Sequence, residues 1–150
     1  MKSCAFFGHR DMNYEPQRER IREILIDLIE REGITQFYSG NRGNFERACS
    51  GLVRELKEIF PHIRNTMVLS YRPTKDFALP SCYDDSVYLL EREVPRAYAI
   101  LETNKRLVEL ADVIVSGVIY AFGGAYKAYE YARKKMKNII EVELLTESGK

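Results

Sequence analysis

The chain has 150 residues, enough for a single domain over 1–150 that buries about two-thirds of its unfolded surface. Its 23 lysines and arginines nearly balance its 22 aspartates and glutamates, so we expect no long-range attraction to nucleic acid and no nucleic-acid partner. No run approaches the ~20 apolar residues of a membrane span and the start lacks a signal-peptide pattern, which predicts a cytoplasmic protein with no membrane partner.

Cysteine and histidine usage argues against metal chemistry. Cys4, Cys49 and Cys82 are far apart, odd in number and in no Cys-x-x-Cys pair, which disfavours both a disulfide framework and a zinc site. His9 and His62 are the only histidines, and no carboxylate cluster has ligand spacing. We therefore expect no metal and no cofactor.

Short apolar runs alternate with helical patterns along the chain. The helical pattern at 16–32 has Pro16 in its first turn and Gly33 just past its end, both typical boundaries. Asn44 is a candidate N-cap for the next helix. We expect strands at 3–8, 36–39, 66–71, 113–118 and 139–142, a short extra strand at 87–90, and helices at 16–32, 45–60, 96–111 and after Gly124. The tail from Thr146 is expected to fray.

This alternation predicts an α/β fold: a three-layer, Rossmann-like, doubly wound and mainly parallel sheet. The apolar runs lack polar alternation, so both faces of the sheet should be covered by helices. In the simplest strand order, 3-2-1-4-5, the strands at 3–8 and 113–118 are neighbours where the winding reverses. Ligands of such sheets bind in the crevice at that point.

Three loops should open into this crevice. They contain Gly8-His9-Arg10, then Ser39-Gly40 with Gly43, and Gly123-Gly124. A glycine pair at a helix start lets backbone N–H groups approach a phosphate or carboxylate, although the same pair can simply make a turn. His9 can likewise cap a turn, and Glu46 can simply complement the helix dipole.

Several short segments occur in an order that is specific to one superfamily. The chain resembles the short SLOG-superfamily proteins of the YpsA-like type over nearly its whole length. The resemblance implies a Rossmann-like fold that binds a nucleotide or nucleotide-derived small ligand in a sensing or regulatory role. The segments are Phe7-Gly8-His9-Arg10, Ser39-Gly40-x-x-Gly43-x-Phe45-Glu46, Tyr83-Asp84-Asp85, Pro95-Arg96-Ala97, Asn104 before Ala111-Asp112-Val113, and Gly123-Gly124-Ala125-x-Lys127 with Glu130-Tyr131-Ala132. The loops and the resemblance together give these ligand-binding candidates: Gly8, His9, Arg10, Ser39, Gly40, Gly43, Asn104, Gly123, Gly124 and Lys127.

A more distant likeness is to the cytokinin-activating phosphoribohydrolases, with their motif Pro-Gly-Gly-x-Gly-Thr-x-x-Glu. It implies N-glycosidic hydrolysis of a nucleoside 5′-monophosphate as an alternative function, with Glu130 or Glu46 as the catalytic carboxylate. Phe122, Tyr126 and Lys127 replace the proline, third glycine and threonine, so ligand binding is the first hypothesis. A protein-interaction scaffold is a further alternative. Superfamily members often dimerise, so a homo-oligomer is an option to test.

Overall fold

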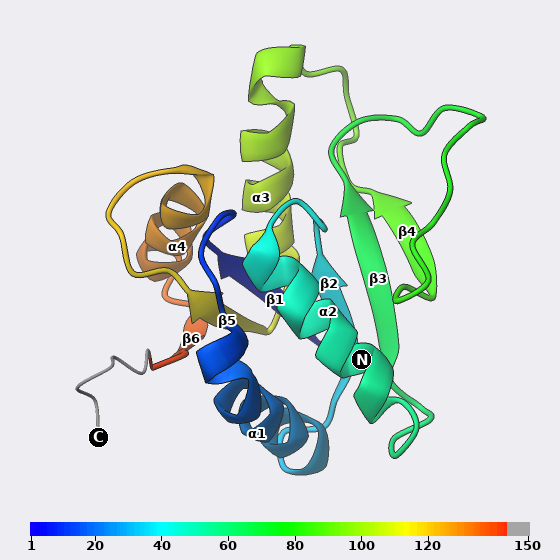
Figure 1. The fold of residues 1–150 in the computed structure, drawn as a ribbon. Coiled ribbons are helices and arrows are strands. Elements are labelled where there is room, and N and C mark those ends of the chain that lie inside the picture. The colour runs from blue at the N-terminus through cyan, green and yellow to red at the C-terminus, as the bar shows by residue number, and fades with distance from the viewer. Residues whose placement is uncertain (144–150) are drawn as a thin grey trace.

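The computed structural model describes residues 1–143, and these form one all-parallel sheet of six strands (Figure 1). The strand order is β4-β3-β2-β1-β5-β6. The strands are β1 (Lys2–Gly8), β2 (Ile34–Ser39), β3 (Arg64–Leu69), β4 (Asp85–Tyr88), β5 (Val113–Gly117) and β6 (Asn138–Glu141). The helices are α1 (Arg18–Glu30), α2 (Asn44–Leu56), α3 (Ala99–Leu110) and α4 (Gly124–Lys134), with the 3-10 turns η1 (Glu15–Gln17) and η2 (Arg96–Tyr98) before α1 and α3.

The predicted winding is confirmed, with the extra strand β4 added at the edge beside β3. β4 lies two residues earlier than the predicted 87–90, because a half-exposed edge strand lacks a distinct apolar run. Asn44 was predicted to be the N-cap of α2, but it is the first residue of the helix itself. Gly43 takes the N-cap position, and the Asn44 side-chain amide donates to the Met12 carbonyl at 3.1 Å. The predicted frayed tail from Thr146 lies outside the described residues.

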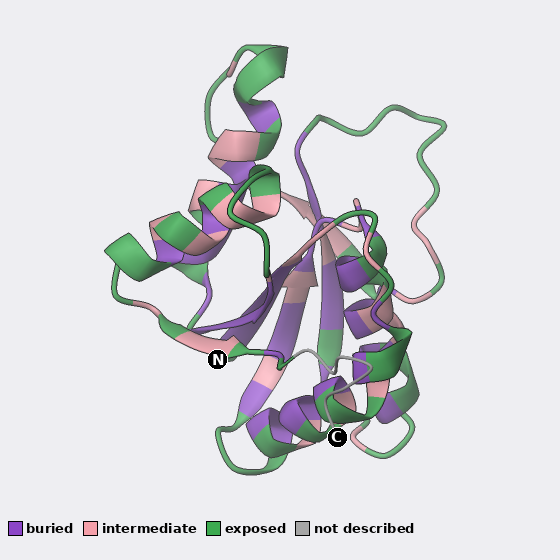
Figure 2. Cartoon of the chain, turned by 60° about the vertical axis from the view of Figure 1, so that its left-hand side comes forward, coloured by how far each residue is buried: buried purple, intermediate pink, exposed green. Residues whose placement is uncertain are grey.

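Helices cover both faces of the sheet, as predicted (Figure 1). Cys4 and Phe6 of β1 pack with α1 and α2, whereas Ala5 and Phe7 pack with α3 and α4. Successive side chains of a strand point to opposite faces, so one apolar strand serves two cores. Figure 2 shows the result as buried central strands between helices that are buried on their inner sides. No helix in the described part is long and apolar enough to cross a membrane.

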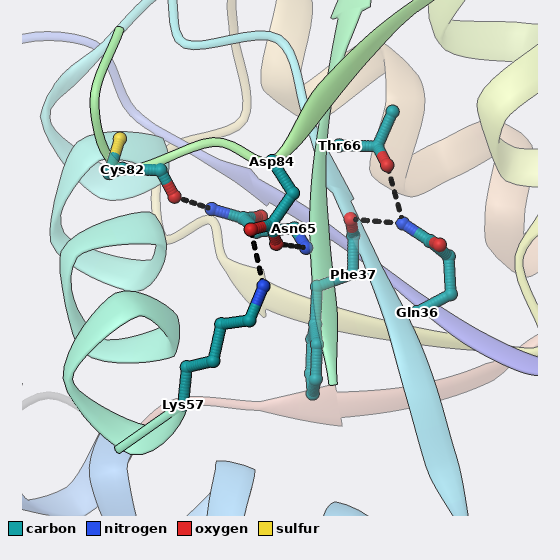
Figure 3. A network of polar contacts seen from close by, with 7 residues as sticks. All are labelled: Gln36, Phe37, Lys57, Asn65, Thr66, Cys82 and Asp84. Atoms are coloured by element: carbon teal, nitrogen blue, oxygen red, sulfur yellow. Dashed lines mark hydrogen bonds and ion pairs between the residues drawn. The ribbon is translucent and has the colours of Figure 1, made fainter. Parts of the chain in front are cut away.

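A polar network anchors the long segment that connects β3 to β4. The Asp84 carboxylate accepts the Asn65 backbone N–H at 2.8 Å and pairs with Lys57, while the Asn65 side chain donates to the Cys82 carbonyl at 3.0 Å (Figure 3). Burial alone would raise the pKa of Asp84, but the hydrogen bonds from Lys57 and Asn65 outweigh it and lower that pKa. Asp84 of the Tyr83-Asp84-Asp85 segment therefore has a structural role, holding the segment before β4 against β3 and the end of α2.

Candidate functional site

A cavity of about 610 Å³ opens at the carboxyl ends of β1 and β5, where the winding reverses. It brings together predicted residues from all three loops. Those on its wall are Gly8, His9, Arg10, Gly43, Glu46, Asn104, Gly123 and Gly124. The predicted residues Ser39, Gly40, Lys127 and Glu130 are not on this wall. The wall also includes Arg42, Ile100, Tyr120 and Phe122, which the sequence analysis did not select as site residues.

Two glycines make room for an aromatic ring beneath the cavity. Gly8 of β1 pairs with Gly117 of β5, and both lie against the fully buried Phe45 at the start of α2. A Cβ atom at Gly8 would come closer than 3.0 Å to the Phe45 side chain, and one at Gly117 would lie 2.5 Å from its Cδ1. Gly8 therefore has a packing role in addition to its place on the cavity wall.

His9 holds the loop between β5 and α4. Its Nε2 accepts the backbone N–H groups of Ile119 and Tyr120 at 2.8 and 2.9 Å. A nitrogen that accepts two such bonds cannot carry a proton, so the ring is neutral with its proton on Nδ1. Burial lowers the pKa of His9 below its ordinary 6.5, which favours the same state. The His9 backbone N–H in turn donates to the Tyr14 hydroxyl at 2.8 Å.

Exposed aromatic rings stand beside the cavity. Tyr120 and Phe122 stack with ring centroids 5.6 Å apart and an interplanar angle of 24°, and the His9 ring lies 5.1 Å from Tyr120. We call Tyr120 and Phe122 the aromatic ledge; they are 50% and 67% exposed. Large exposed apolar surfaces next to a cavity often mark binding sites. The signal in the sequence was the pair of aromatic residues just before Gly123-Gly124.

The amino end of α4 follows directly after the ledge. Gly123 has a φ of 91°, in the left-handed region that favours glycine, and it is the N-cap of a helix without a side-chain cap. A Cβ at Gly123 or Gly124 would meet nothing within 4 Å. Space is therefore open beside the first turn of α4, whose first N–H groups have no partner within the helix. Lys127 and Glu130 lie further along α4 with exposed side chains.

Glu46 braces the loop that precedes its own helix. One carboxylate oxygen accepts the Gly40 N–H at 2.7 Å and the other accepts the Arg42 N–H at 2.9 Å. The side chain is 8% exposed. Both carboxylate oxygens thus bind backbone N–H groups of the preceding loop, a bracing role that the sequence did not indicate.

Arg42 joins three segments across the cavity wall. Its guanidinium donates to the Ser70 hydroxyl at 2.9 Å and to the Asn104 side-chain oxygen at 2.8 Å. A Cβ at Gly40 would lie 2.6 Å from the Arg42 Cζ, so the absence of a side chain at Gly40 makes room for the guanidinium. Arg42 fills a variable position of the loop pattern, which is why the sequence pattern did not select it.

Ser39 faces the interior of the protein. Its hydroxyl lies 2.7 Å from the Tyr83 hydroxyl and 3.0 Å from that of Ser50, and it is fully buried. Burial raises the pKa of Tyr83 to about 12, so this tyrosine remains a neutral hydrogen-bonding group. Ser39 therefore connects β2, α2 and the segment before β4.

Comparisons with known proteins identify the fold. Models of known protein families and curated protein sequences give no match. The solved structure of TM1055 is similar with a TM-score of 0.58 and 19% identity, over 99% of this chain and 76% of that one. The molybdenum cofactor (Moco) carrier protein from Chlamydomonas reinhardtii is similar with a TM-score of 0.58 and 14% identity, over 94% and 75% of the two chains.

DNA processing protein A (DprA) is a further structural neighbour. The Streptococcus pneumoniae protein gives a TM-score of 0.71 at 12% identity, with 99% of this chain covering 53% of that one. The Helicobacter pylori protein, described as binding single-stranded DNA, gives 0.63 at 15% identity, with 93% covering 64%. A fold used for DNA binding overturns the expectation of no nucleic-acid partner, because net charge does not reveal local charge. TM1055, DprA and the carrier protein each share their architecture with this chain, and these likenesses show that it has a Rossmann-like α/β fold.

Proposed function

We propose that the protein binds a nucleotide or nucleotide-derived small ligand in the cavity beside Gly123-Gly124, in a sensing or regulatory role. The observation that carries this proposal is the uncapped amino end of α4 next to the aromatic ledge, on the wall of one cavity of about 610 Å³. That volume is within the usual range for small-ligand sites, about 300–1,000 Å³. The Moco carrier protein shares this fold and, by its name, carries a cofactor. The resemblance of the loop segments to YpsA-like proteins of the SLOG superfamily supports the same kind of ligand.

The two halves of such a ligand have different partners in the cavity. The first N–H groups of α4 and the helix dipole favour a phosphate. Arg10 lies on the same wall with an exposed side chain, and no carboxylate in residues 1–143 forms an ion pair with it. The ledge rings offer a face to a planar base, and such stacking contributes about 1–3 kcal/mol per base.

The positions of the two candidate carboxylates favour binding over hydrolysis. Glu46 already accepts two backbone N–H bonds, and Glu130 is exposed and away from the cavity wall. A general acid or base must reach the reacting atoms at about 2.6–3.2 Å. The two backbone N–H bonds of Glu46 and the place of Glu130 outside the wall therefore support binding as the first proposal.

A thermal-shift screen with a matched pair of variants tests the proposal. The screen compares nucleotides, ADP-ribose, inorganic phosphate and free nucleosides, and a ligand at 100 times its Kd adds about 2.7 kcal/mol of stability. Compounds that combine phosphate and base should shift the melting temperature more than either half alone. Gly124→Val should abolish the shift, because its side chain occupies the space at the helix start where a phosphate would lie.

Gly51→Val is the control, since Gly51 lies in α2 with open space around it and away from the cavity. It should fold and retain the ligand-induced shift. A flat response of the wild-type protein to every compound at millimolar concentration would refute ligand binding and favour the scaffold alternative. A full shift in Gly124→Val would remove this loop from the site.

A further inference from the structure

A second hollow of about 610 Å³ lies beside the first, at the carboxyl ends of β3 and β4. Ser70 lies on its wall and accepts the hydrogen bond from Arg42, which lines the first cavity. The first turns of α3 contribute to both, with Ala99 on the second wall and Ile100 and Asn104 on the first. The two hollows are therefore neighbours along the same edge of the sheet.

Two arginines stacked on tyrosines line this second hollow. The Arg96 Cζ lies 4.2 Å from the centroid of the Tyr71 ring, and the Arg72 Cζ lies 4.9 Å from that of Tyr88. Stacking on an aromatic face holds the guanidinium plane and leaves its N–H edge available. Within residues 1–143, neither Arg72 nor Arg96 forms an ion pair or donates a side-chain hydrogen bond. Their N–H edges are therefore not occupied by other side chains.

The charge balance of the hollow favours an anion. Glu93 is the single carboxylate on its described wall, against the two guanidinium groups of Arg72 and Arg96. A guanidinium has the geometry to donate two parallel hydrogen bonds to one phosphate. Tyr71 and Tyr88 add apolar ring surface beside these donors.

We infer that this hollow binds a second phosphate-linked nucleotide unit, so that the ligand comprises at least two nucleotides joined through phosphate. This inference rests on the proposed function, because the first unit would occupy the cavity at Gly123-Gly124. Each hollow, at about 610 Å³, lies within the range of a small-ligand site, and a mononucleotide would fill one of them only. A pyrophosphate-linked dinucleotide and a short single-stranded oligonucleotide share the required chemistry.

Binding of three probes to the full chain tests the inference by calorimetry: AMP, NAD and a short oligo-dT. The variant is Arg72→Gln with Arg96→Gln. The control is Arg47→Gln with Arg133→Gln, which removes the same charge from exposed positions outside both hollows and includes an arginine near a tyrosine ring, Tyr129. We expect at least one two-unit probe to bind more tightly than AMP and to lose tenfold or more in affinity in the variant. AMP affinity should stay within about twofold in both.

Salt dependence gives a second readout. Each lost phosphate contact on a single strand should reduce the slope of log affinity against log salt by about 0.7. Whichever of NAD and oligo-dT responds identifies the linkage. Two-unit probes that bind no better than AMP, or equally well in the variant and the control, overturn the inference while leaving binding at Gly124 intact. Absence of binding by all three probes refutes both the inference and the proposed function.

Discussion

Gly8→Ala should destabilise the protein even though it adds only one methyl group. Gly8 and Gly117 face each other across β1 and β5, and the ring of Phe45 packs directly over both. The new Cβ would overlap the Phe45 side chain at less than 3.0 Å. Phe45 is fully buried and also packs edge-on against Tyr14, with centroids 4.8 Å apart, so it has no free space to move into.

The expected size follows from two opposing effects. Overpacking a filled core costs about 1–3 kcal/mol. Replacing glycine by alanine reduces the entropy of the unfolded chain and returns about 0.4–1 kcal/mol. The clash involves ring and Cβ atoms rather than a flexible tip, so we expect a net loss of about 1–2 kcal/mol. For a protein of this size that lowers the melting temperature by roughly 2–8 °C.

Urea unfolding of Gly8→Ala and Gly51→Ala gives a matched comparison. A Cβ at Gly51 meets nothing within 4 Å in the middle of α2, so Gly51→Ala should gain about 0.5–1 kcal/mol. Adding Phe45→Leu to Gly8→Ala should cost less than the sum of the two single changes, because the smaller side chain relieves the overlap. A Gly8→Ala variant as stable as the wild type would show that the ring does not pack there.

Two further predictions concern the loops of the cavity. Because burial lowers the pKa of His9 below 6.5, the unfolded chain binds a proton first as the pH falls, and the stability that neutral His9 contributes is present above about pH 6.5 and declines below it. The unfolding free energy should therefore decrease more between about pH 7.5 and about pH 5 for the wild type than for His9→Asn. An equal decrease in both proteins would contradict this role of His9. Glu46→Gln should cost about 1–3 kcal/mol in urea unfolding, because an amide can accept only one of the two N–H bonds from Gly40 and Arg42. An unchanged midpoint would argue against this brace.

The strand order was predictable because it depends on chain-level rules. Apolar runs such as the one in β5, buried throughout, identify central parallel strands, and right-handed crossovers leave few ways to connect them. The edge strand β4 was placed two residues too late, as was its neighbour β3. β4 has no fully buried residue and takes its position from pairing with β3, which local sequence does not record.

The gathering of loops at one edge was predictable, whereas the direction of each side chain was not. Ser39 ends β2 at the expected place, yet its hydroxyl joins Ser50 and Tyr83 in the interior. His9 reached the cavity, but its Nε2 is occupied by two backbone N–H groups from a loop more than 100 residues away in the chain. Such partners are set by tertiary contacts, so a residue pattern can locate a site without assigning the hydrogen bonds within it.

The same distinction explains why the net charge was a poor guide to nucleic-acid binding. A net charge of +1 would exclude an anionic partner only if the charges were spread evenly. The walls of the two hollows instead gather Arg10, Arg42, Arg72 and Arg96, against Asp11, Glu46 and Glu93. Glu46 is committed to two backbone N–H groups, and the positive end of the α4 dipole adds to the arginines. One edge of a nearly neutral protein therefore gathers more arginines than carboxylates, which supports the phosphate ligand that we propose.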